Sequence, residues 1–329
     1  MTPSADLPAN ARPDRPLLAR LSIATFAWVM GIGGLGNTYL AAHKVFGVPQ
    51  AIAHVLIGAA GACFLALVVA HAAKAILHPD AVREEFGHAV RSSFFPAASV
   101  AALVVSIGVR GWSGPLAEVL WWSGAGAHLA LAITLIRRWL LHAQDEGVMT
   151  PAWFIPVVGN ILVPVAGVPL GHVEPSWFFF SVGLVLWLVF FTIALHRILF
   201  FTALGERSVP TLFILLAPPS IGLLAYFAFS EGRTGPLADI LYCVALFMAL
   251  LLATMAREIT HGAFFMSWWA MTFPLDGWAG ACLLYHRARP GPFTAVVAIT
   301  ATAIATGVVA WVSFLTLRHI RSGRAFRED

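Results

Sequence analysis

Long apolar runs separated by short polar connections make up most of the chain. A helix needs about 20 mostly apolar residues to cross the hydrocarbon core of a bilayer. By this standard the pattern predicts ten membrane-spanning helices, joined by connections too short to hold a separate soluble domain. The ten expected helices cover residues 20–42, 50–77, 93–110, 115–136, 152–170, 176–199, 210–229, 236–256, 266–285 and 292–317.

Prolines repeat along these helices with a period close to sixty residues. Those inside a helix belong to odd-numbered helices, at intervals of 60, 62 and 56 residues between Pro96, Pro156, Pro218 and Pro274. A second series lies at the first turn of the even-numbered helices, where the N–H that proline lacks would be unpaired anyway. Its members are Pro49, Pro115, Pro175, Pro236 and Pro292.

This period predicts five helical hairpins that all enter the membrane from the same side. Repeats of one orientation are related by an axis along the membrane normal. Because helix breakers are tolerated away from lipid, we expect the odd-numbered helices to form an inner ring and the even-numbered helices an outer ring. The fold class is then an all-α integral membrane protein with a central pore; in the alternative, the bundle is close-packed and its kinks serve packing alone. The candidate pore-lining or kink residues are Pro96, Pro156, Asn160, Pro218, Pro219 and Pro274.

Composition supports the membrane assignment. Hydrophobic residues make up 59% of the chain and charged residues 11%, whereas a soluble domain carries about 25% charged residues. These values exclude a soluble globular enzyme, a disordered protein and a nucleic-acid binder, and we expect no enzymatic activity.

The distribution of basic residues predicts the orientation. Lysines and arginines divide fifteen to five between the two sides of this topology, and cytoplasmic loops carry the excess. We therefore expect both termini in the cytoplasm and the helices in a bacterial inner (plasma) membrane. Residues 1–19 are expected to form a cytoplasmic tail, residues 20–317 the transport domain, and residues 318–329 a basic cytoplasmic tail.

Histidines on the even-numbered helices raise the hypothesis of a haem-binding redox protein. They are His54, His71, His128 and His196. No pair of them has a metal-binding spacing, no CxxC occurs among the three cysteines, and no nucleotide-binding motif is present. We expect no cofactor and no metal.

Four stretches carry a resemblance to a known family: HAVRSSFFP (88–96), TPAWFIPVVG (150–159), PTLFILLAPP (210–219) and SWWAMTFP (267–274). They resemble the tellurite-resistance/dicarboxylate transporter family, which includes bacterial TehA proteins, yeast malate permeases and plant guard-cell slow anion channels. The resemblance implies five hairpins around one pore per subunit, a homotrimer, and a phenylalanine that plugs the pore. The matching residue is Phe273; an apolar ring can close a conduit by occlusion or by dewetting.

Asp276 departs from the small apolar residue expected at its place in this family. Acidic residues near the bilayer centre are costly and usually face a cavity or a partner. Asp276 is therefore a candidate proton site, an ion-pair or hydrogen-bond partner between helices, or a residue in water at the outer mouth.

Two further residues have alternative roles. Arg91, at the start of the third helix, is expected either to attract anions to the inner mouth or to anchor the helix at the cytoplasmic surface. Asn160 is expected either to present its amide to a dehydrated anion or to cap carbonyls freed at the Pro156 kink.

The first functional hypothesis is an anion channel with a phenylalanine-gated central pore that conducts small anions such as chloride or nitrate. The second is a proton-coupled transporter of a four-carbon dicarboxylate or of an oxyanion such as tellurite or sulfite. Expected partners are the anion, membrane lipid and two further copies of the chain, with no nucleic acid.

Overall fold

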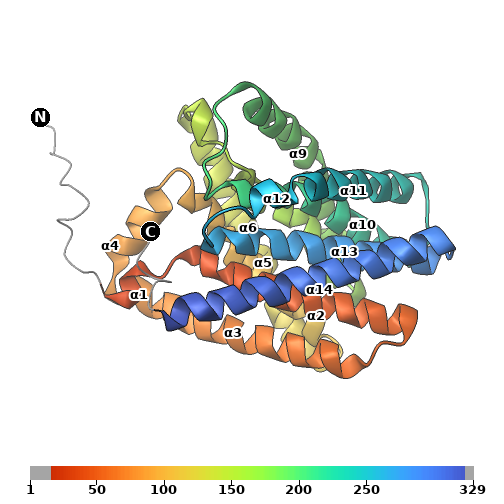
Figure 1. Ribbon diagram of the computed structural model, residues 1–329. Helices are drawn as coiled ribbons and strands as arrows, with labels where there is room; N and C mark the ends of the chain where they lie inside the picture. Colours follow the sequence, from red (N-terminus) through yellow and green to blue (C-terminus); the bar gives the residue numbers. More distant parts are fainter. Residues whose placement is uncertain (1–15, 323–329) are drawn as a thin grey trace, which may run out of the picture.

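The computed structural model describes residues 16–322, and every regular element within them is a helix (Figure 1). Of the two expected tails, residues 1–15 and 323–329 lie outside the described residues. The all-α membrane fold predicted from the sequence is confirmed.

Five long, uninterrupted helices correspond to the even-numbered helices of the sequence pattern. They are α3 (Gln50–Leu77), α6 (Gly114–Leu141), α9 (Val173–Phe200), α11 (Pro236–Thr254) and α14 (Pro292–Arg321). Each packs against the segment that precedes it in the chain, so the chain runs as successive hairpins.

The preceding segments form a second, inner set. They are α2 (Phe26–Phe46), η3–α5 (Arg91–Phe94 and Pro96–Val109), a broken fifth segment over residues 151–170, η8–α10 (Val209–Leu216 and Ala217–Phe229) and η9–α13 (Met266–Met271 and Thr272–Ala288). The α2 helix contacts α5, α5 contacts the fifth segment, that segment contacts α10, α10 contacts α13, and α13 returns to α2. The inner segments therefore close into a ring.

Short helices cover one end of the ring. In Figure 1, α1 (Leu17–Arg20) and α4 (Pro79–Gly87) lie at the same end of the bundle as the last turns of α14. We call this the termini side and the opposite end the distal side. Two further short helices are η2 (Ile23–Thr25) and α12 (Ala256–Ile259), and η4 (Glu146–Val148) lies in the connection after α6.

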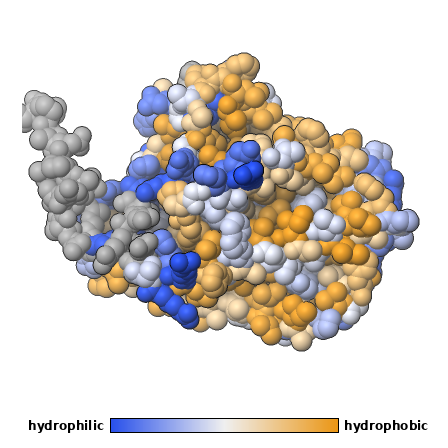
Figure 2. Space-filling model, viewed as in Figure 1, coloured by the Kyte–Doolittle hydropathy of each residue, from blue (hydrophilic) through white to orange (hydrophobic). Residues whose placement is uncertain are grey.

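Burial separates the two rings. Between 22% and 33% of the most apolar stretch of each long helix is buried within the chain, against 67–78% for the third, fifth and seventh segments. The long helices expose apolar side chains such as Val55, Leu188 and Phe314. Figure 2 shows the resulting hydrophobic face across the middle of the bundle, with hydrophilic residues gathered toward its ends.

Eight segments of the described chain are long and apolar enough to cross a membrane. The two expected helices that fall short coincide with α2 and with η9–α13. Both lie in the inner ring and carry polar residues, including Asn37 and Lys44 on α2 and Asp276 and Arg287 on α13. The count of ten therefore stays a prediction.

The inner-ring prolines mark junctions between two kinds of helix. Pro96 is the first residue of α5, Pro218 the second of α10, and Pro274 the third of α13, each shortly after a 3₁₀ segment. Proline fits the first turn of an α-helix because no intrahelical bond is lost there. The expected mid-helix kinks are thus starts of new α-helices within a continuous segment.

The fifth segment changes its helix type most often. It runs through η5 (Pro151–Trp153), α7 (Phe154–Val158), η6 (Gly159–Leu162), α8 (Val163–Gly167) and η7 (Val168–Leu170). Pro164 lies at the start of α8, whereas Pro156 lies within the single turn of α7. Such an irregular backbone is tolerated at membrane depth only where protein shields it from lipid, and α9 packs along it.

A glycine allows this close approach. A Cβ atom at Gly183 of α9 would lie 2.9 Å from the backbone nitrogen of Ile161 and 3.1 Å from the Cβ of Asn160. Backbone atoms of η6 cannot move aside as the end of a flexible side chain can.

Gly183→Ala is expected to lower the free energy of unfolding by about 1–3 kcal/mol, the usual cost of overpacking. The matched control is Gly126→Ala on α6, where an added Cβ meets nothing within 4 Å; there alanine gains up to about 1 kcal/mol of helix propensity. Thermal unfolding of the purified protein in detergent measures both. Equal melting temperatures for the two variants would contradict the close packing of α9 on η6.

Candidate functional site

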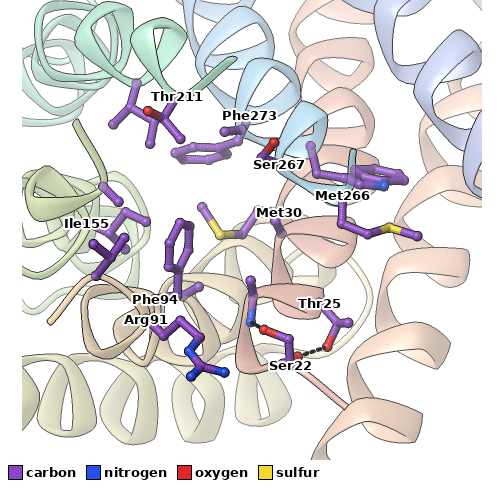
Figure 3. Close-up of a pocket in the computed structure, with 18 of the residues that line it drawn as sticks. Ser22, Thr25, Met30, Arg91, Phe94, Ile155, Thr211, Met266, Ser267 and Phe273 are labelled. Carbon is purple, nitrogen blue, oxygen red and sulfur yellow. Dashed lines mark hydrogen bonds between the residues drawn. The ribbon is translucent and has the colours of Figure 1, made fainter. Parts of the chain in front are cut away.

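A large cavity enters the ring from the termini side. Its volume is about 950 Å³, and its walls come from all five inner segments. Aromatic and thioether side chains line part of it, among them Met30, Phe94 and Met266 (Figure 3). Polar residues gather near the entrance, where Ser22, His88 and Arg91 line the wall.

A second cavity enters from the distal side. Its volume is about 460 Å³, and it is lined by α2, α5, the fifth segment, α10 and α13. Its charged lining residues are Lys44, Arg110, Glu231, Asp276 and Arg287.

The two cavities meet at three apolar side chains. Leu162 of η6, Ile221 of α10 and Phe273 of α13 line both cavities, and no other residue among 16–322 does. In Figure 3 the ring of Phe273 projects into the open space between Thr211 and Met30. A narrow apolar constriction on the ring axis therefore separates two wider vestibules.

The junction between η9 and α13 positions Phe273. Phe273 is the second residue of α13 and Pro274 is the third, so the side chain leaves the backbone where the helix changes type. Pro218 and Pro274 line the termini-side cavity. Pro96, Pro156 and Pro219 are buried and line neither cavity.

Asn160 serves the backbone of its own segment. Its Nδ2 donates to the carbonyl oxygens of Val157 (2.8 Å) and Pro156 (3.4 Å). The residue is 1% exposed and lines neither cavity. These hydrogen bonds fit the carbonyl-capping alternative, in which the side chain of Asn160 faces its own backbone and not a cavity.

Asp276 lies one helical turn beyond Phe273. It lines the distal cavity but is only 1% exposed, and neither carboxylate oxygen has a hydrogen-bond partner among the described residues. Its backbone oxygen accepts a hydrogen bond from Thr38 Oγ1 (2.9 Å), and its side chain lies against Gly34, where an added Cβ would come within 2.8 Å of Oδ2. Of the three expected environments, the described structure provides neither an ion pair nor open water at the mouth.

Among the basic residues that line the termini-side cavity, Lys74 is neutralised by an ion pair and Arg91 is not. Lys74 Nζ lies 2.7 Å from Glu85 Oε2, and Glu85 Oε1 also accepts from the backbone N–H of Ile23 (2.8 Å). The side chain of Arg91, in contrast, has no partner among the described residues. Partial burial first, and then the charge of Arg91, lower the pKa of the neighbouring His88, and Glu84 opposes this shift.

Sequence reasoning missed the distal charges as site residues. In the fifteen-to-five division of basic residues, Lys44, Arg110 and Arg287 are three of the five on the side opposite the termini, and no further role was assigned to them. Their positions at the distal ends of α2, α5 and α13 could have suggested the grouping once the inner ring was proposed. Among the described residues no cluster of three or more metal-ligating side chains exists.

Comparison with known proteins identifies the family. The family model described as "SLAC1: Voltage-dependent anion channel" matches residues 20–317. The chain is 27% identical to the S-type anion channel SLAH2 of Arabidopsis thaliana over 312 residues, which are 92% of this chain and 60% of the relative. It is 28% identical to SLAH3 of the same plant, with 92% and 49% covered. It is 22% identical to the tellurite resistance protein TehA homolog of Haemophilus influenzae, with 92% and 91% covered.

The chain thus spans about half to three-fifths of the length of these two plant relatives and nearly all of the bacterial one. The resemblance inferred from the four sequence stretches is confirmed. The family model matches the chain across both rings of helices. This chain therefore belongs to the SLAC1 voltage-dependent anion channel family, which also includes TehA.

Proposed function

We propose that the chain conducts small anions along the axis of the inner ring and that Phe273 is the gate. The observation that carries this proposal is the apolar constriction at which the two vestibules meet, made by Leu162, Ile221 and Phe273. An anion can cross it only after losing part of its water, because these side chains offer no hydrogen bond in exchange. Selectivity then follows dehydration cost.

The names of the relatives and the charges of the entrances support the choice of anions. SLAH2 and SLAH3 are named as anion channels. At the termini-side entrance, Arg91 contributes a positive charge that no described carboxylate neutralises. Such a charge raises the local concentration of anions at a pore mouth.

The proposal includes a membrane context. Both termini face the cytoplasm, the apolar faces of the outer helices meet lipid, and the chain assembles as a homotrimer in a bacterial inner membrane. The apolar outer faces support the lipid contact, and the charge asymmetry of the loops supports the orientation.

A second candidate function rests on Asp276. A buried carboxyl without a partner is strongly favoured in its neutral, protonated form, so its proton could be released and rebound as an anion passes. This would make the chain a proton-coupled transporter of dicarboxylates or oxyanions.

Phe273→Ala is expected to raise chloride or nitrate flux into proteoliposomes by about tenfold or more, since lowering the barrier by about 1.4 kcal/mol already gives tenfold. Phe94→Ala is the matched control, because Phe94 lines the termini-side cavity but not the constriction. Flux that rises equally in both variants, or in neither, would remove Phe273 from the role of gate.

Asp276→Asn is expected to leave the free energy of unfolding unchanged or higher, since the amide cannot ionise in this apolar surrounding. If the chain is a channel, nitrate flux in this variant stays within about twofold of the parent, a change of under about 0.5 kcal/mol in the barrier, and neither protein responds to a pH gradient. Succinate uptake that a pH gradient drives in the parent and not in the variant would support the transporter.

Arg91→Glu is expected to lower anion entry from the termini side about tenfold at low ionic strength, because a mouth charge steers anions. The loss should shrink above about 0.5 M salt, where screening is strong. Arg83→Glu is the control: Arg83 lies on the same side, is exposed, pairs with Asp80 and does not line the cavity. An effect of Arg91→Glu that ignores salt would indicate a structural role.

A further inference from the structure

The basic residues at the distal end fall into two groups. Arg289 lies 2.9 Å from Asp239, and Arg233 donates from Nε to the carbonyl oxygen of Ser230 (3.0 Å). Lys44, Arg110 and Arg287 have no hydrogen-bond or ion-pair partner among the described residues. These three are the basic residues that line the distal cavity.

The three unpaired cations come from adjacent inner-ring helices. Lys44 lies in the last turn of α2, Arg110 is the C-cap of α5, and Arg287 lies in the last turn of α13. Both α5 and α13 pack against α2. Arg110 and Arg287 are close enough to Lys44 for their charges to repel it.

Helix-end electrostatics alone does not explain this arrangement. A cation in the last turn of a helix gains about 0.3–1 kcal/mol from the helix dipole, but it gains this equally when it points to lipid headgroups or to bulk water. Here three cations converge on one cavity, and the acidic lining residues are Glu231 and the buried Asp276. Like charges that converge without an ion-pair partner are costly unless an anion joins them.

We propose that the distal vestibule is a binding site for a divalent oxyanion, with Lys44, Arg110 and Arg287 as its ligands. Guanidinium groups match the paired oxygens of carboxylates and tetrahedral oxyanions, and an ammonium adds a further charge-assisted bond. The cavity of about 460 Å³ has room for such an ion with part of its water. A dianion gains from all three cations, whereas a monovalent anion neutralises one.

The position of the site gives it a consequence for transport. A dianion held there lies between the distal side and Phe273, with the Asp276 carboxyl beneath it. It would therefore compete with monovalent anions that enter from that side. This consequence rests on the proposed function, whereas binding itself does not.

Equilibrium binding of radiolabelled sulfate to the full-length protein in nanodiscs of zwitterionic lipid tests the site. The parent should bind sulfate at a stoichiometry of one per chain, and nitrate should compete weakly. Arg110→Gln and Arg287→Gln should each weaken binding about tenfold or more, since each removes a charged hydrogen-bond donor. Arg233→Gln, which changes a distal arginine outside the cavity lining, should leave the affinity within about twofold, under about 0.5 kcal/mol.

Each contrary result has a clear meaning. Equal affinity in the parent and both cavity variants, or no saturable sulfate binding, overturns the proposal. Parent binding that disappears in nanodiscs rich in anionic lipid also overturns it, because lipid phosphates then fill the site.

Chloride flux through Phe273→Ala serves as the folding readout for variants built on that background. If chloride flux equals that of Phe273→Ala alone and sulfate does not bind, the proposed channel is supported and the proposed binding site is not. Sulfate binding in a protein whose chloride flux does not depend on Phe273 supports the site and removes the proposed gate.

Discussion

The shielding of an irregular backbone from lipid is the constraint on which the rest of this structure depends. In a bilayer, every backbone N–H and C=O must find a partner within the protein, and regular helices achieve this alone. Four of the five inner segments are not regular: for example, η8 runs for eight residues as a 3₁₀ helix, and the fifth segment changes type four times. Such segments persist only behind a second ring of unbroken helices.

This constraint also gives the pore its shape. A junction between 3₁₀ and α geometry changes the rise and direction of the chain, and four inner segments have a junction near a proline. Phe273 lies at one junction and Leu162 precedes another, at the boundary of η6 and α8. The constriction is therefore made where backbones change helix type, and the wider vestibules lie to either side.

The sequence predicted the architecture well because its signals were local and repeated. The period of the prolines gave the hairpins, and the rule that breakers avoid lipid divided them into inner and outer rings, as the contacts and burial confirm. The side chains were harder to predict. Whether Asn160 faces the pore or its own carbonyls depends on the rotation of η6. Which of three environments Asp276 occupies depends on its neighbour on α2, and Gly34, not a basic residue, lies against it. Contacts between segments that are distant in the chain produce no periodic pattern in the sequence.

The distribution of charge around the constriction completes the physical picture. The residues that meet at the centre are apolar, so in the proposed channel an anion at this point would lose part of its water without gaining a counter-charge. Unpaired cations lie toward both entrances, Arg91 on the termini side and three on the distal side. Cations placed at the narrow point would bind an anion too tightly to release it, whereas cations at the vestibules concentrate anions without trapping them at the barrier. Under the two proposals, the side with more unpaired cations is the side on which anion valence matters most, which makes the two ends of the pore chemically unequal.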